Sequence, residues 1–330
     1  MQPAPMIGSK DERTKRANNI LYSKRHLIEF CLAESSNFLS IQKYQLAVPA
    51  ASQALKFCRE LDGDTSILLV EPYLQLGRAS YGLKQYKQCE EYLSLAQWIV
   101  LNSDRCADIT RSRLHQLLGR LHATQRNYVK AKEEFSKSIY YSSRCYGAES
   151  IATSLGYFSL GEVFISLEQA ENAVAFFDKV VDIWYKFLSA LLTRVDASRT
   201  GADPENNIEQ LSEESIAEGR SQLVSVIDYR KQLLGENHIA SGEALFTIGI
   251  FDFFLLGQQF SAEEFIKAAY AIYQSQLGSD HPSTTHVDSV LSQVKLEGKS
   301  VARGGIDSQS QFAESQEFNY VEQSEEAIQV

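Results

Sequence analysis

Small and bulky side chains recur along this chain at an interval of 42 residues. The dipeptides Leu76-Gly77, Leu118-Gly119 and Leu160-Gly161 lie at that spacing, and one further step toward the amino terminus reaches Ser35. Counted from each glycine or serine, four more positions follow nine, twelve, sixteen and nineteen residues later, at helical spacing. Their usual order is aromatic, small, bulky and small: Tyr44, Ala47, Ala51, Ala54; Tyr86, Cys89, Leu93, Ala96; Tyr128, Ala131, Phe135, Ser138; Ala170, Ala173, Phe177, Val180.

This order resembles the tetratricopeptide repeat (TPR), in which two antiparallel helices, A and B, touch closely where side chains are small. Glycine inside a helix costs about 1 kcal/mol relative to alanine, so its recurrence in helix A predicts a close approach of helix B. HEAT and armadillo arrays share a period of about 40–47 residues, but this order of small residues is not expected there. The sequence therefore predicts an all-α, TPR-like superhelical solenoid of antiparallel helix pairs with about six repeats.

Three predicted turns between helices share a second pattern. The segments 145–150 (CYGAES), 233–238 (LLGENH) and 276–282 (QLGSDHP) resemble the LG-x-x-HP turn of kinesin-light-chain-type repeats. The last turn places a fifth clear repeat over about 240–276, with Gly257, Ala262, Ile266 and Ala269 at the expected positions relative to Ile250.

Five segments follow from these patterns. Polar and turn-forming residues predict an exposed loop over 193–210, and the stretch after Gly298 is too acidic and too poor in aliphatic residues to form a core. The predicted segments are a flexible basic amino terminus (1–19), four TPR-like repeats (20–190), a degenerate repeat containing the loop (191–235), a carboxyl-terminal repeat with a closing helix (236–298) and a disordered acidic tail (299–330).

Charge and hydropathy narrow the classes of partner. The 330 residues carry a net charge of −10, which argues against nucleic-acid binding because that requires a concentrated basic surface. The longest apolar stretch, 244–257, is interrupted by Asp252, and the first ten residues lack the apolar core of a signal peptide, so no membrane partner is expected. The charge is uneven, with a local balance of +4 over 1–26 and −5 over 300–330.

Catalytic chemistry has no recognisable signature in this chain. Nucleotide-binding loops, metalloprotease and kinase motifs and zinc-type cysteine spacings are all missing from the sequence. His115 and His122 are read as polar groove residues rather than metal ligands, and adjacent acids such as Glu133-Glu134 as solvated positions. Trp98 and Trp184 are expected in the core. We therefore predict no enzyme, no catalytic residue, no metal and no cofactor.

A protein-binding groove is the remaining candidate site. In TPR arrays the A helices line the concave wall, and three arginines on adjacent wall helices form a plausible clamp for carboxylates, with ordinary solvated arginines as an equal alternative. We hypothesise that an acidic segment enters this groove, with the chain's own residues 307–326 as a competing occupant. The predicted groove residues are Glu71, Leu74, Arg78, Tyr81, Arg113, Gln116, Arg120, Phe158 and Glu162, with Leu155 and Ile165 beside them.

A family resemblance adds a cellular setting. Residues 69–98, 117–164 and 178–188, with shorter stretches at 26–31 and 47–57, resemble the TPR region of the zinc finger MYND domain-containing protein 12 family. The resemblance covers about residues 20–190 and extends beyond the repeat positions into EPYL, AQW and DIWYKFL. Cys31 is the first cysteine of this chain, so the family's zinc finger is missing and no zinc is carried over.

This resemblance implies a component of a cilium or flagellum. Members of the family are implied to serve single-headed inner dynein arms, so the expected partners are a tetratricopeptide repeat protein 29-like protein, an inner-arm axonemal dynein heavy chain and doublet microtubule-associated proteins. The expected function is a non-enzymatic axonemal scaffold with a cytoplasmic pre-assembly pool. The alternative is a cytosolic cargo or signalling adaptor of the kinesin-light-chain-like type.

Overall fold

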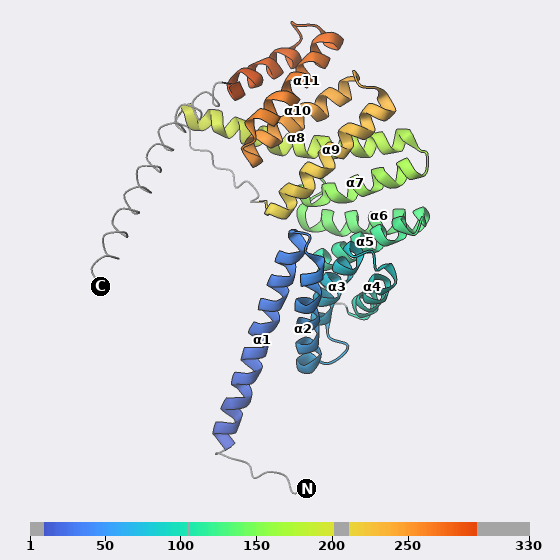
Figure 1. Ribbon diagram of the computed structural model, residues 1–330, viewed down its shortest axis with the longest axis vertical. Helices are drawn as coiled ribbons and strands as arrows, with labels where there is room; N and C mark the ends of the chain where they lie inside the picture. Colours follow the sequence, from blue (N-terminus) through green and yellow to red (C-terminus); the bar gives the residue numbers. More distant parts are fainter. Residues whose placement is uncertain (1–9, 104–105, 201–210, 296–330) are drawn as a thin grey trace, which may run out of the picture. The chain divides into compact units, whose positions relative to one another are not determined.

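Helices make up all the regular structure that this computed structural model describes, over residues 10–103, 106–200 and 211–295 (Figure 1). The predicted all-α fold is confirmed. In chain order the elements are α1 (Lys10–Ser40), α2 (Tyr44–Asp62), the short 3-10 helix η1 (Ile67–Leu69), α3 (Val70–Gly82), α4 (Tyr86–Leu101), α5 (Asp108–Thr124), α6 (Tyr128–Tyr146), α7 (Ile151–Ser166), α8 (Ala170–Thr200), α9 (Glu213–Leu234), α10 (Ile239–Leu256), α11 (Gln259–Leu277) and a closing helix over 282–295.

The described residues divide into two compact units. The first contains residues 10–183 and 211–217, and the second contains 184–200 and 218–295. In the first unit α1 pairs with α2, α3 with α4 and α5 with α6, and successive pairs stack through α2 against α3 and α6 against α7. These pairs are the A and B helices that the repeat predicts.

The contact between a glycine of helix A and a bulky residue of helix B sets the spacing within each pair. A methyl group added at Gly119 would lie 2.6 Å from the ring of Phe135, and one added at Gly161 would overlap the ring of Phe177. In both cases the bulky partner stands sixteen residues after the glycine, as the 42-residue pattern predicts. The small positions Cys89 and Ala131 are fully buried. The bulky residue therefore packs on the glycine of its own repeat, in addition to any role between repeats.

Five turns from helix A to helix B in the described residues each contain one residue in the left-handed region. Gln42, Lys84, Arg126 and Glu168 have φ values of 57–60°, and Gly257 occupies the same position in the fifth repeat with φ 62°. The helix end closes around this residue, as where the Gln85 amide donates to Ser80 O at 2.8 Å. The turn conformation thus follows from helix-end hydrogen bonding rather than from glycine.

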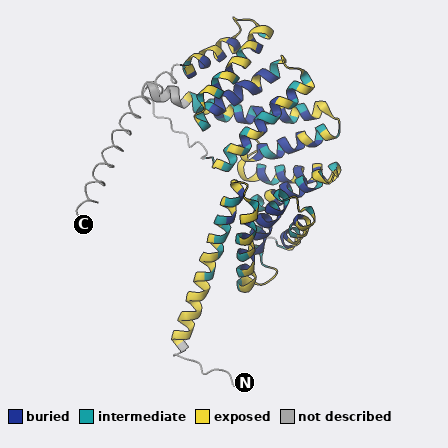
Figure 2. Ribbon diagram, in the orientation of Figure 1, coloured by how far each residue is buried: buried dark blue, intermediate teal, exposed yellow. Residues whose placement is uncertain are grey.

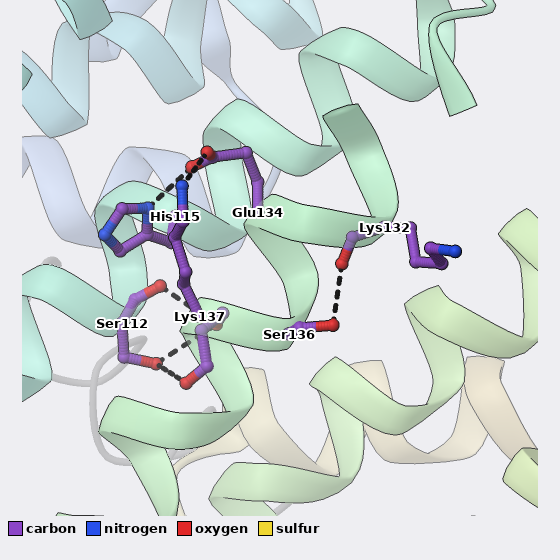
Figure 3. A network of polar contacts seen from close by, with 7 residues as sticks. Ser112, His115, Lys132, Glu134, Ser136 and Lys137 are labelled. Carbon is purple, nitrogen blue, oxygen red and sulfur yellow. Dashed lines mark hydrogen bonds and ion pairs between the residues drawn. The ribbon is translucent and has the colours of Figure 1, made fainter. Parts of the chain in front are cut away.

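A buried polar network joins α5 to α6 (Figure 3). His115 Nδ1 lies 2.6 Å from Glu134 Oε2, and Lys137 Nζ lies 2.7 Å from Glu134 Oε1. Nearby, Ser112 and Ser138 each donate a hydroxyl hydrogen bond of 3.0 Å to the other's backbone carbonyl. Because serine occupies the small position nineteen residues after Gly119, the two backbones approach closely enough for this exchange.

Two sequence interpretations are corrected by this network. His115 faces the B helix of its own repeat, where it stacks on Tyr141 with ring centroids 5.6 Å apart, so it is not a groove residue. Glu134 is 8% exposed rather than solvated. Burial raises the pKa of Glu134, but hydrogen bonds from His115 and Lys137 outweigh it and lower that pKa to about 2.

A buried carboxylate lies at the centre of the second unit. Asp252 on α10 is fully buried, and Arg220 of α9 donates two hydrogen bonds to its oxygens at 2.8 and 2.9 Å. Ser261 Oγ of α11 donates a third at 2.6 Å. This pairing offsets the cost of a charge in an apolar helix. By length and composition alone α10 is long and apolar enough to cross a membrane, and 61% of it is buried inside the protein.

The two tryptophans differ from one another. Trp184 is 1% exposed and packs edge-to-face on Phe251 at 5.1 Å, which confirms its predicted core position. Trp98 is 54% exposed, so the core prediction is wrong for it. The residues that α4 buries are Cys89, Leu93, Ala96, Ile99 and Val100, and Trp98 is not among them.

Several segment boundaries shift. Helix α1 begins at Lys10, within the predicted flexible stretch, because 10–19 contains neither glycine nor proline; residues 11–22 are nevertheless exposed (Figure 2). Helix α8 continues to Thr200, within the predicted loop over 193–210, since no breaker precedes Gly201. The remainder of that loop, residues 1–9 and the predicted tail lie outside the described residues.

Replacing Gly119 with alanine tests the helix contact. Helix propensity would improve by about 1 kcal/mol, yet we expect the free energy of unfolding to fall by about 2 kcal/mol, because the added methyl overlaps Phe135. Urea unfolding followed by circular dichroism measures this. Adding Phe135→Leu to the same variant should restore part of the loss, and an unchanged loss in the double variant would contradict the assignment.

The Glu134 network predicts a pH-dependent stability. The pKa of Glu134 is lowered in the fold, so its stabilisation is present above the ordinary value of 4.5 and is lost as pH falls toward 2. We expect Glu134→Gln to cost about 2 kcal/mol at pH 7 and clearly less at pH 3. Denaturant unfolding at both pH values measures the difference. The control is Glu133→Gln, which changes an exposed neighbour and should have little effect; equal losses for Glu134→Gln at both pH values would refute the prediction.

Candidate protein-interaction surface

Polar side chains link successive A helices of the first unit across 43 residues, one more than the repeat interval. Tyr81 of α3 shares a hydroxyl hydrogen bond of 3.0 Å with Thr124 of α5, 43 residues away. Gln116 of α5 donates from Nε2 to Ser159 Oγ of α7 at 2.8 Å, again 43 residues away. These contacts place α3, α5 and α7 side by side, with equivalent positions aligned. We call the predicted groove residues on these three helices the A-helix face.

The predicted residues divide by burial. Leu74, Gln116 and Phe158 are buried, so they support the A-helix face rather than contact a partner. Two of the predicted residues, Arg113 and Glu162, are exposed and so accessible to a partner. The others are half-buried and partly accessible: Glu71, Arg78, Tyr81, Arg120, Leu155 and Ile165.

The accessible part of the face is charged, and two of its arginines, Arg78 and Arg113, pair with carboxylates. Arg113 of α5 pairs with Glu71 of α3 at 3.5 Å, which is a contact between neighbouring A helices 42 residues apart. Arg78 pairs with Glu214, which lies 136 residues away in the first turn of α9. Arg78 and Arg113 therefore each have their own acidic partner, and the three-arginine clamp, with Arg120 as its third member, stays a prediction.

The sequence pattern missed two features of this surface. Gln75 of α3 is buried and donates to Leu32 O of α1 at 3.2 Å, which extends the polar links to the first helix. The sequence contains one indication of this contact, because Gln75 directly precedes Leu76-Gly77, where the helices approach closely. Glu214 had no signal, because it lies in the predicted degenerate repeat (191–235), where the 42-residue pattern is not recognisable.

A second exposed surface lies on a B helix. Leu95, Trp98 and Leu101 of α4 are 46%, 54% and 78% exposed and stand three residues apart, so they form an apolar stripe.

Metal binding has no candidate in the described part of the chain, where no group of three or more His, Cys, Asp or Glu side chains comes together.

Comparison with known proteins identifies one repeat directly. The family model for the tetratricopeptide repeat matches residues 156–183, which include the Gly161–Phe177 contact. Among solved structures, the chain is similar to the nearly identical TPR-like repeats of a Podosopora anserina kinesin light chain, with 12% identity, 76% of this chain and 96% of that chain covered, and a TM-score of 0.41.

Two further structures show comparable similarity. BtubC (BKLC) from P. vanneervenii has 14% identity, with 81% of this chain and 82% of that chain covered and a TM-score of 0.34. Aspartyl phosphate phosphatase F from Bacillus subtilis has 14% identity, with 84% and 73% covered and a TM-score of 0.43. From its own helix contacts and the matched repeat, the described part of this chain is an all-α protein built of TPR-like helix pairs.

Proposed function

We propose that this chain is a non-enzymatic scaffold or adaptor that binds another protein through its A-helix face. Stacked helix pairs present a surface that is ordered before binding, so a partner meets little entropic cost on the scaffold's side. The face combines exposed charge with a buried support of Leu74, Gln116 and Phe158. These are the features of a recognition surface rather than of a reaction centre.

The ion pair between Arg78 and Glu214 is the observation that carries this proposal. A carboxylate from a distant segment, 136 residues along the chain, reaches the face and pairs with an arginine of α3. Both side chains are partly exposed, at 31% and 27%. The face is thus able to receive an acidic segment that does not belong to the neighbouring helices.

The proposed setting is the axoneme of a cilium or flagellum. Its support is the sequence resemblance over about residues 20–190 to the zinc finger MYND domain-containing protein 12 family. In this proposal the chain helps to dock or assemble a single-headed inner dynein arm, together with a tetratricopeptide repeat protein 29-like partner, an inner-arm dynein heavy chain and doublet microtubule-associated proteins. A cytoplasmic pool would hold the protein before assembly.

A cytosolic cargo or signalling adaptor of the kinesin-light-chain-like type is the second candidate. Its support is the geometry of the two histidine turns. His238 Nδ1 accepts from the Ala240 amide and His281 Nδ1 from the Ser283 amide, both at 3.2 Å, and each follows a glycine with positive φ, Gly235 or Gly278. The two LG-x-x-H turns therefore share one structure.

Detergent extraction of ciliated cells separates the two candidates. We expect the tagged full chain to stay with the axonemes after the membrane and soluble proteins are removed, because a scaffold is bound to the doublets. Quantitative immunoblotting of both fractions measures this. Recovery of the chain only in the detergent-soluble fraction would contradict the axonemal setting and support the cytosolic adaptor.

A charge reversal tests the A-helix face itself. Arg113→Glu places a negative charge beside Glu71, so we expect at least a fivefold loss of the proteins that copurify with the chain. The matched control is Lys132→Glu, the same charge change at an exposed position on the B helix of the same repeat. Equal copurification with both variants, each folded by circular dichroism, would place partner binding elsewhere.

A further inference from the structure

The first turn of α9 occupies the A-helix face at Arg78. Residues 211–217 belong to the first unit, although they begin 21 residues after the end of the four predicted repeats at residue 190. Within that turn Glu214 pairs with Arg78, whereas the adjacent Glu213 is exposed. A single carboxylate at a defined position therefore makes the contact.

Arg78 differs in this respect from the other paired arginine. The carboxylate on Arg113 comes from Glu71, on the neighbouring A helix and one repeat away, so that pair is part of the repeat packing. The carboxylate on Arg78 comes instead from the predicted degenerate repeat, 136 residues along the chain. Arg78 is thus a point on the face where an acidic segment from outside the neighbouring repeats is received.

The segment that reaches Arg78 has a defined local structure. The Ser215 amide donates to Ser212 Oγ at 3.2 Å, and the two serine hydroxyls lie 2.9 Å apart, which caps the first turn of α9. Glutamate in the first turn is also favoured by the helix dipole. The result is a preformed acidic turn, Leu211-Ser212-Glu213-Glu214-Ser215, that presents one carboxylate to an arginine.

We propose that Arg78 marks a docking site for an acidic helical turn of a partner protein, and that the first turn of α9 is an internal occupant that this partner displaces. The inference rests on the proposed function and names its partner chemistry: a carboxylate in the first turn of a helix, flanked by small polar residues. The half-exposed state of both Arg78 and Glu214 makes the exchange accessible to an incoming carboxylate. The internal copy lowers the apparent affinity until it is displaced.

Peptide binding to the full chain tests this directly. The probe is a fluorescein-labelled synthetic peptide of residues 211–222, measured by fluorescence anisotropy at low and physiological salt. We expect Glu214→Gln to bind the probe about fivefold more tightly than the unmodified chain, because its internal competitor is weakened by the loss of one partly exposed ion pair. Glu213→Gln, the same change at the exposed neighbour, should bind like the unmodified chain.

Further measurements test whether Arg78 is the binding site and which acidic segment can occupy it. Arg78→Gln in the Glu214→Gln background should remove the gain, and a probe carrying glutamine at position 214 should bind at least fivefold more weakly. An unlabelled peptide of residues 307–326 tests the chain's own acidic stretch: competition would make that stretch an occupant of the Arg78 site, and no competition would limit the site to acidic turns like that of α9. Circular dichroism confirms that each variant is folded.

The outcomes separate this inference from the proposed function. Equal probe binding by the Glu214→Gln and Glu213→Gln chains, or no probe binding by any variant, would overturn the docking site at Arg78. In that event a loss of copurifying protein in Arg113→Glu would still support the adaptor function. Probe binding that depends on Arg78, without any effect of Arg113→Glu, would retain the site and reject the wider face.

Discussion

The distance between helices A and B depends on one contact, a glycine of helix A against a bulky side chain of helix B. At Gly119 the ring of Phe135 occupies the space that a methyl group would need. Since packing inside proteins is dense, this contact fixes the separation of the two helices as well as their pairing. Small residues of helix B on either side of Phe135, such as Ala131 and Ser138, are also buried, so the two helices stay close along this line.

Helix spacing in turn determines which polar side chains meet. Because each repeat restores the same separation, Tyr81 reaches Thr124 and Gln116 reaches Ser159 at an offset of 43 residues in both cases. Charges on the same helices are aligned by the same geometry, as Arg113 is with Glu71. The recognition properties of the A-helix face are therefore a consequence of core packing, even though the side chains concerned are polar and accessible.

Repetition explains what could be predicted from the sequence. Glycines at equal intervals indicate where the backbones of two helices approach closely, so the helix pairing and the buried positions follow from the spacing alone. The core prediction for Trp98 was wrong because it followed side-chain size and apolar surroundings. The buried face of α4 instead includes Cys89, Leu93, Ala96 and Val100 at helical spacing, and Trp98 is not part of it. The burial of Glu134 depends on His115 across the helix pair, and Glu214 pairs with Arg78 from the predicted degenerate repeat, where the 42-residue pattern is lost. Such tertiary partners leave no periodic trace.

The left-handed turn residues have a consequence for the energy of the whole array. An ordinary side chain in this conformation carries roughly 1 kcal/mol of strain, and Gln42, Lys84, Arg126 and Glu168 each carry it once per repeat. Gly257 avoids it. Each repeat that is added by duplication therefore adds the backbone strain of one left-handed residue as well as favourable packing. In exchange, each turn holds a long polar or charged side chain at a fixed position, so the edge formed by these turns can diversify in charge without altering the backbone.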